Sequence, residues 1–154
     1  MEIVMRDILV VDDFSHVIFQ NAFKQYFEEL GIKVNDWEGL FEEITKEGGN
    51  KAYIRINEDE TIVGFILFRN EIITNWFFEE KVGFIREFWI SKGMRSNGHG
   101  SHLLKLVEDY FKEDGIHKSI LTTNTAEKFY ESHGYRKDKS YSAKNNDEVF
   151  VKLL

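Results

Sequence analysis

Apolar residues at two different spacings predict a strand and then a helix at the start of the chain. Residues 3–11 are dominated by Ile, Val and Leu, which favours a first strand. From Phe14 to Leu30 apolar residues recur at the spacing of one helix face. Gly31 follows and is a typical helix stop. We therefore expect a strand followed by an amphipathic helix.

A second helix is expected after a short gap. Either Asn35 or Asp36 can cap its first turn with a side-chain oxygen. The Glu-Gly-Gly-Asn segment at residues 47–50 ends it, because glycine readily adopts the backbone conformation of a helix C-terminus. The apolar positions that define the buried face of this helix are Trp37, Leu40, Phe41 and Ile44.

The middle of the chain predicts a β-hairpin. Residues 51–57 and 61–69 both favour strands, and the acidic residues 58–60 between them are typical of a turn. Residues 70–81 are ambiguous and fit either a buried run or a surface flap. For Trp76–Phe78 within that segment core packing is the expectation, while an acceptor pocket and a dimer face are the alternatives.

The last third of the chain mixes strands with helices. Its order includes one strand–helix–strand crossover, so the fold class is α+β with a mixed sheet. Asn124 followed by Glu127 predicts a capping box for the last helix. The expected elements are strand 82–90, loop 94–100, helix 99–113, strand 118–123, helix 124–133, and strands 135–141 and 148–153 joined by an Asn-Asn-Asp turn.

The amino-acid composition excludes several classes of protein and of functional site. With 154 residues, 42% of them apolar, the chain is long and apolar enough for one folded domain and is not a disordered protein. The absence of Cys excludes disulfides, thiolate metal sites and a Cys nucleophile. Acidic residues outnumber basic ones by 27 to 20, which argues against nucleic-acid binding and makes a cationic substrate more plausible.

The N-terminal segment predicts neither export nor membrane insertion. It is too short and too acidic for a signal peptide, and no apolar run approaches the roughly 20 residues that span a bilayer. We therefore expect a cytoplasmic protein without a membrane or nucleic-acid partner.

The segment from Arg95 to Ser101 is the first candidate for chemistry. It follows a strand, contains Gly98 and Gly100, and opens an amphipathic helix. Backbone N–H groups of such a loop, together with the positive end of the helix dipole, can bind an anionic phosphate, and Arg95 adds a charge at the rim. The alternative is a turn that needs glycine only for its geometry. A Walker A loop is excluded because Lys does not precede Ser101, and a Rossmann fingerprint should open the first strand–helix unit.

A second segment, Thr123 to Tyr135, contains the next candidate. Ala126, Phe129 and Tyr130 share one face of the expected helix. For Tyr130 the simplest interpretation is a core aromatic whose hydroxyl group is satisfied inside the protein.

Together, the two segments resemble the acetyl-CoA-binding motifs of the GNAT (general control nonderepressible-related) N-acetyltransferase superfamily. Arg95–Gly100 matches R-x-x-G-x-G/A, and Ala126–Tyr135 matches A-x-x-F/L-Y-x-x-x-G-F/Y, in order and at the usual separation. The resemblance implies one domain over residues 1–154, with a mixed, mostly antiparallel central sheet flanked by helices on both faces. It also implies that acetyl-CoA is the acetyl donor and that no metal takes part.

The resemblance further implies which residues bind the cofactor. Two departures from the family pattern matter: Thr123 replaces the usual Asn, so either Thr123 or Asn124 contacts pantetheine, and Lys92 replaces a common Pro. Tyr130 would donate a proton to the departing thiolate. The pantetheine arm would pair with the backbone of Phe88, Trp89 and Ile90. The residues implied around the diphosphate are Arg95, Ser96, Asn97, Gly98, His99, Gly100 and Ser101.

Glu87 is the candidate for activating the acceptor. A primary amine must lose a proton before it attacks, and a carboxylate at the end of the transfer strand can take that proton directly or through water. Glu87 could instead only attract the cation, or pair with Arg86 or a Lys of a neighbouring strand. Without Cys, the simplest mechanism is direct attack of a small-molecule or peptide amine on the thioester.

Two further functions stay open as alternatives. An acyl-CoA-binding or sensor module would keep the fold without the reaction, and a nucleotide-binding protein would use the glycine loop differently. His99 and His102 could ligate a metal, but no third ligand has a defined spacing, so we expect them to flank the phosphates. The aromatic residues that are expected to be exposed permit a homodimer.

Overall fold

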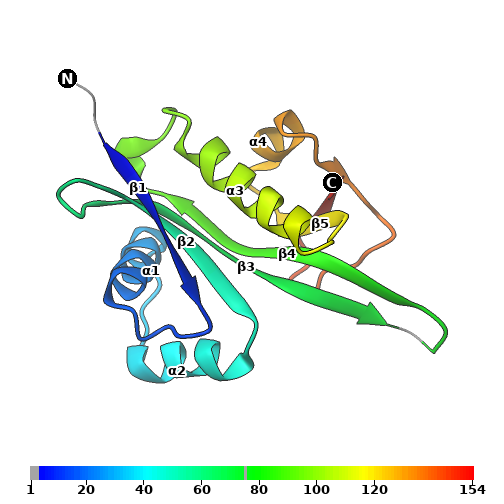
Figure 1. Ribbon diagram of the computed structural model, residues 1–154, viewed down its shortest axis with the longest axis horizontal. Coiled ribbons are helices and arrows are strands. Elements are labelled where there is room, and N and C mark those ends of the chain that lie inside the picture. Colours follow the sequence, from blue (N-terminus) through cyan, green and yellow to red (C-terminus); the bar gives the residue numbers. More distant parts are fainter. Residues whose placement is uncertain (1–3, 75) are drawn as a thin grey trace.

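The computed structural model describes residues 4–74 and 76–154 (Figure 1). Helices and strands alternate along it much as the sequence pattern predicts. The elements are β1 (Met5–Val11), α1 (Val17–Leu30), α2 (Trp37–Glu47), β2 (Asn50–Asn57), β3 (Ile62–Thr74), β4 (Glu79–Ile90), a 3-10 turn (Lys92–Met94), α3 (His99–Glu113), β5 (Lys118–Thr123), α4 (Glu127–Ser132), β6 (Arg136–Lys137) and β7 (Glu148–Leu153).

All strands join one seven-stranded sheet in the order β1-β2-β3-β4-β5-β7-β6. The pairs from β1 to β4 are antiparallel, β4 and β5 are parallel, and β7 pairs antiparallel with both β5 and β6. The parallel pair is possible because α3 crosses over between β4 and β5. The expected α+β fold with a mixed, mostly antiparallel sheet is therefore confirmed.

Helices cover both faces of this sheet (Figure 1). Neighbouring residues of β3 point to opposite faces, so Phe65 packs with the α1 and α2 side while Ile66 packs with the α3 and α4 side. Two apolar cores result, one on each face. Because burial of a large apolar side chain stabilises the fold by about 1.5–3 kcal/mol, these two cores fix the sheet between the helix layers.

Two irregularities of β4 separate its C-terminal half from the neighbouring strand β5. The register of β3 against β4 shifts at Leu67, which pairs with Glu87, while Phe68 pairs with Ile85. A bulge of this kind redirects side chains and bends the strand. In the described part of the chain, β4 and β5 pair at Gly83–Ser119 and Phe84–Ile120 and at no later residue. The C-terminal half of β4 therefore separates from β5.

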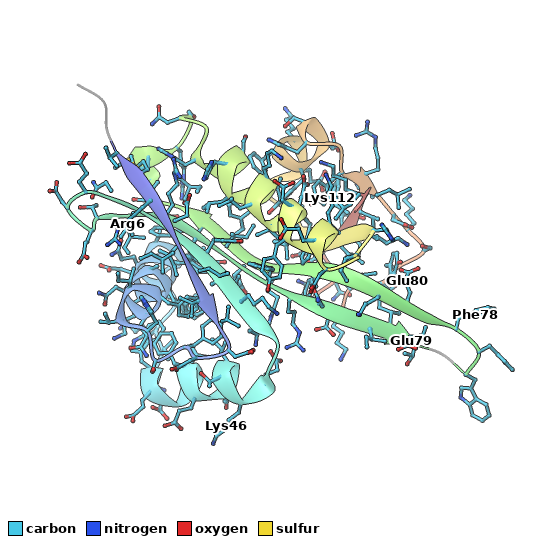
Figure 2. All side chains as sticks on the ribbon, viewed as in Figure 1. Arg6, Lys46, Phe78, Glu79, Glu80 and Lys112 are labelled. Carbon is cyan, nitrogen blue, oxygen red and sulfur yellow. The ribbon has the colours of Figure 1, made fainter. Side chains whose placement is uncertain are left out.

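Residues 70–74 and 76–81 belong to the far end of a long β3–β4 hairpin, an arm that extends beyond the body of the sheet (Figure 1). Trp76, Phe77 and Phe78 are 97%, 87% and 74% exposed. Figure 2 shows Phe78 at the end of this arm. The expected core packing of this aromatic run is therefore wrong. Neither β2 nor β5 extends far enough along the arm to bring a helix layer over it.

Three local expectations also need correction. The strand expected over residues 135–141 is reduced to β6, because the chain turns away after Lys137. The capping box of Asn124 and Glu127 is not formed, since Ala126 is the N-cap of α4 and has no side-chain bond. Instead, Thr123 Oγ1 accepts from the Ala126 amide at 3.1 Å. For α2 the alternatives resolve to Asp36, which accepts from the Gly39 amide at 2.9 Å.

Among the described helices, none is both long and apolar enough to cross a membrane.

Candidate active site

A cavity of about 720 Å³ lies where β4 and β5 separate. It brings together the end of β4, the loop after it, the N-terminus of α3 and one face of α4. Most of the sequence-predicted site residues line it, whereas Glu87, Asn97, Thr123 and Asn124 do not. Its lining comprises Phe88, Trp89, Ile90, Met94, Arg95, Ser96, Gly98, His99, Gly100, Ser101, Thr125, Ala126, Phe129, Tyr130 and His133.

The loop between β4 and α3 presents main-chain donors to this cavity. Gly98 is the N-cap of α3 with a φ of 83°, a left-handed conformation that glycine adopts without strain. It offers no side-chain cap, so the N–H groups of the first helical turn lack intrahelical acceptors. A Cβ on Gly100 would lie 3.4 Å from the Phe129 ring, so glycine lets α3 approach α4 closely. This end of the cavity favours an anion.

Arg95 connects the loop to the opposite face of the sheet. Its Nη2 donates to Glu29 Oε2 of α1 at 2.6 Å, and its Nε donates to the Ile90 carbonyl at 2.9 Å. Trp89 Nε1 donates to the same Glu29 oxygen at 3.1 Å. Burial alone would raise the pKa of Glu29, but these two hydrogen bonds outweigh it and lower the pKa. The charge of Arg95, expected at the rim of the anion site, is thus paired with Glu29. The backbone amides at the N-terminus of α3 remain as the principal donors for an anion.

Glu87 and Tyr130 lie near one another where β4 separates from β5. Glu87 Oε2 accepts a hydrogen bond of 2.7 Å from the Tyr26 hydroxyl. Burial raises the pKa of Glu87, and the Tyr26 hydrogen bond and the charge of Arg86 oppose this rise only in part. Tyr130 is buried, and its burial together with the negative charge of Glu87 raises the pKa of Tyr130. Tyr130 therefore stays a phenol that can donate a proton at neutral pH.

Glu87 and Arg86 do not form the ion pair that was one of the expected alternatives, because the bulge in β4 directs their side chains to different partners. Arg86 turns to Glu47 at the end of α2, and its Nη1 donates to Asn50 Oδ1 at 2.8 Å. Glu87 turns instead to Tyr26 of α1. The carboxylate is thus held by a neutral donor, which leaves its charge available.

The two histidines of α3 belong to a network with β1 and β2. Arg55 Nε donates to His99 Nδ1 at 3.0 Å and Arg55 Nη1 contacts both carboxylate oxygens of Asp7. His102 Nε2 lies 2.7 Å from Asp7 Oδ2, so this histidine faces β1. In residues 4–74 and 76–154 no group of three or more potential metal ligands is found. Of the two histidines expected beside the phosphates, only His99 lines the cavity.

Sequence analysis missed His133 and Tyr26. His133 precedes the glycine that ends α4, and its Nε2 lies 2.8 Å from Ser101 Oγ in the first turn of α3. Tyr26 lies on the core-facing side of α1, where helical spacing predicts no more than an apolar position. Both residues reach partners that are distant in sequence, so periodicity within a short window could not reveal them.

Comparison with known proteins agrees with this geometry. A model described as acetyltransferase (GNAT) family matches residues 16–135. The structure of a GNAT-family acetyltransferase from Staphylococcus aureus Mu50 superposes with a TM-score of 0.72 at 22% identity, covering 98% of this chain and 99% of that one. No curated protein matches the sequence.

Two similar proteins were solved with coenzyme A or acetyl-CoA bound. The PaiA N-acetyltransferase of Thermoplasma acidophilum, solved with coenzyme A, has a TM-score of 0.63 at 18% identity and covers 100% of both chains. A predicted acetyltransferase of Clostridium acetobutylicum, solved with acetyl-CoA, has a TM-score of 0.71 at 17% identity, covering 91% of this chain and 95% of that one. At these identities the similarity shows the fold, and the family model, which matches well over half of the chain, shows that this protein belongs to the acetyltransferase (GNAT) family.

Proposed function

We propose that this protein is a single-domain N-acetyltransferase that moves the acetyl group of acetyl-CoA to a primary amine by direct attack. One observation carries the proposal: the uncapped N-terminus of α3 and the buried phenol of Tyr130 line one and the same cavity. The separated edge of β4 lines the same cavity through Phe88, Trp89 and Ile90, and Glu87 precedes them on that strand. This arrangement fits a long ligand with an anionic end and a reactive end.

The amides of Ser96 to Ser101 hold the diphosphate of the cofactor, since main-chain donors and the helix dipole favour negative charge there. Phe88 to Ile90 bind the pantetheine arm through main-chain groups that β5 leaves unpaired. A main-chain N–H near Phe88 donates to the thioester oxygen and stabilises the charge that develops on it. Thr123 uses its hydroxyl group to accept from the Thr125 and Ala126 amides, so the exposed Asn124 is the better candidate for a polar contact with pantetheine.

Glu87 and Tyr130 move the protons of the reaction. Glu87 takes a proton from the acceptor ammonium, and the free amine attacks the thioester carbon. As the new C–N bond forms, the C–S bond breaks and Tyr130 donates its proton to the departing sulfur. The nitrogen then loses its second proton, through water, to the Tyr130 phenolate, and Glu87 releases the first proton to solvent, so both side chains return to their starting states. A carboxylate whose pKa is raised by burial is a stronger base toward an ammonium ion than an exposed one. The products are an amide and coenzyme A.

A thiol-release assay tests this function. Acetyl-CoA is offered with polyamines, aminoglycosides, amino acids and peptides, and free thiol is measured over time. The proposal predicts amine-dependent thiol release together with mass-spectrometric evidence of the acetylated amine. Binding of acetyl-CoA without release for any amine would favour the acyl-CoA-binding module. Stronger competition by ATP than by coenzyme A would instead favour a nucleotide-binding protein.

A further inference from the structure

His133 of the α4 C-terminus lines the cavity and joins α4 to the first turn of α3. Its Nε2 lies 2.8 Å from Ser101 Oγ, and its Nδ1 lies 2.8 Å from the Phe129 carbonyl oxygen. Nδ1 also lies 3.1 Å from Ser132 Oγ, whose hydroxyl donates to the same Phe129 carbonyl at 2.6 Å. Both neighbours of Nδ1 therefore present acceptor oxygens, so we assign the ring hydrogen to Nδ1. The ring also lies 4.5 Å from the Phe129 ring, which helps to fix its orientation.

This tautomer determines the direction of the bond to Ser101. In a neutral imidazole with hydrogen on Nδ1, Nε2 has only a lone pair. The Ser101 hydroxyl must therefore donate to Nε2, and its oxygen presents lone pairs toward the cavity. An anionic oxygen beside the first turn of α3 requires a donor instead, so neutral His133 holds Ser101 in the wrong state for a diphosphate.

Protonation of His133 removes this conflict. The imidazolium donates from Nε2 to Ser101 Oγ and still donates from Nδ1 to Phe129, which frees the Ser101 hydroxyl to donate into the cavity. We propose that binding of the diphosphate is linked to uptake of a proton by His133. In this proposal the Ser101 hydroxyl donates to the bound anion only when His133 is protonated. The inference rests on the proposed binding of coenzyme A in this cavity.

The other charged groups around His133 do not supply this proton. Arg95 is paired with Glu29, and Tyr130 stays protonated because burial raises its pKa. His99 accepts from Arg55, and burial together with the Arg55 charge lowers the pKa of His99. The other charged groups on α4, β6 and β7 are Glu127, Lys128, Glu131, Arg136, the Lys137–Glu148 ion pair, and Lys152, which pairs with Glu108 of α3 and lies beside Gly134.

Titration calorimetry with dephospho-CoA tests the linkage. This ligand keeps the diphosphate but lacks the 3′-phosphate, which would itself titrate near neutral pH. Binding is measured at pH 7 in two buffers of different ionisation enthalpy, and the difference gives the number of protons taken up. We expect uptake of a fraction of a proton. Because uptake favours binding at low pH, we also expect the Kd to rise about three- to tenfold from pH 6 to pH 8.

His133→Gln is the decisive variant. The Gln side-chain amide can donate to Ser101 as Nε2–H of the imidazolium does, but it does not titrate. We expect this variant to bind dephospho-CoA without proton uptake and with a Kd that is constant from pH 6 to pH 8. Ser101→Ala removes the hydroxyl that links the two sites and should also abolish the uptake. His117→Gln is the matched control, because His117 is an exposed histidine before β5 and its replacement should leave the uptake unchanged.

The outcomes separate the linkage from the proposed function. Binding with equal proton uptake in the wild type and in His133→Gln would overturn the linkage and leave cofactor binding intact. Binding by the wild type without any uptake would do the same. Failure of the folded wild type to bind both dephospho-CoA and acetyl-CoA would overturn both. Thermal unfolding of each variant confirms that the compared proteins are folded.

Discussion

The Tyr26 hydroxyl donates a hydrogen bond of 2.7 Å to Glu87 Oε2 and so joins α1 to the bulged part of β4. Burial raises the pKa of Glu87, and this hydrogen bond stabilises the ionised form and lowers it. Tyr26 therefore sets how far the carboxylate departs from its ordinary range. In the proposed reaction Tyr26 is a positioning residue, because it acts through Glu87.

Tyr26→Phe should move the acid limb of the pH profile of kcat/KM to higher pH. Glu87 accepts a proton only when it is ionised, so activity falls as the pH drops through its pKa. Loss of the Tyr26 donor raises that pKa further, and at any pH on the limb less of the enzyme is active. A thiol-release assay from pH 5 to pH 9 measures the shift.

The control for that substitution is Tyr141→Phe. Tyr141 also donates to a carboxylate, Glu80, at 2.8 Å, but this pair lies near the β3–β4 arm. An acid limb that is the same in Tyr26→Phe and in the wild type would remove Tyr26 from the control of Glu87.

Glu87→Gln should lower kcat/KM by about 10²–10⁴-fold, the usual contribution of a general base. The acid limb should disappear, while the Kd for acetyl-CoA should stay within about twofold because Glu87 does not line the cofactor cavity. Glu79→Gln on the exposed end of the same strand is the matched control. Full activity of Glu87→Gln at every pH would exclude Glu87 as the base.

Tyr130→Phe should lower kcat by about 10²-fold or more and leave acetyl-CoA binding nearly unchanged, because only the proton donor is removed. Burial and the charge of Glu87 raise the pKa of Tyr130, so the wild type should lose no activity to Tyr130 ionisation up to about pH 10. Steady-state kinetics and calorimetry measure the two effects. A parallel loss of affinity and kcat would indicate a packing role instead.

Gly83→Ala should destabilise the fold by about 1–3 kcal/mol through overpacking. Gly83 pairs with Ser119 in the parallel contact between β4 and β5, and an added Cβ would overlap the Phe111 ring of α3. At Gly93 an added Cβ meets no atom within 4 Å, so Gly93→Ala is the near-neutral control. Urea unfolding of both variants gives the free energies, and equal stabilities would show that α3 can yield at this position.

Trp76→Ala should change the free energy of unfolding by less than about 0.5 kcal/mol, as an exposed substitution does. Trp89→Ala should cost about 3–5 kcal/mol, because Trp89 is buried against Phe65 and Tyr26. The comparison changes the same residue type on the same hairpin: Trp89 is buried and donates a hydrogen bond to Glu29, whereas Trp76 is exposed. A large loss of stability in Trp76→Ala would show that the arm packs against the body of the protein.

Local sequence signals determined most of the elements of this protein. Helix α1 ends at Leu30 with Gly31 in the left-handed conformation, as the residue types alone predict, and α2 is capped by Asp36, one of the two residues that the sequence offers for this position. The Arg95–Ser101 loop and the α4 segment were also recognisable, because glycine positions and helical spacing are properties of a few neighbouring residues. These signals were sufficient for the fold class and the family.

Only the tertiary structure decided which side chains meet. Tyr26 and Glu87 are 61 positions apart, and Ser101 and His133 are 32 apart, so their contacts depend on how α1, α3 and α4 pack on the sheet. The aromatic run at Trp76–Phe78 is as apolar as a core strand, yet it is exposed because it lies on an arm that extends beyond the described helix layers. A hydrophobic side chain favours burial, but the packing of elements distant in sequence decides whether it is buried.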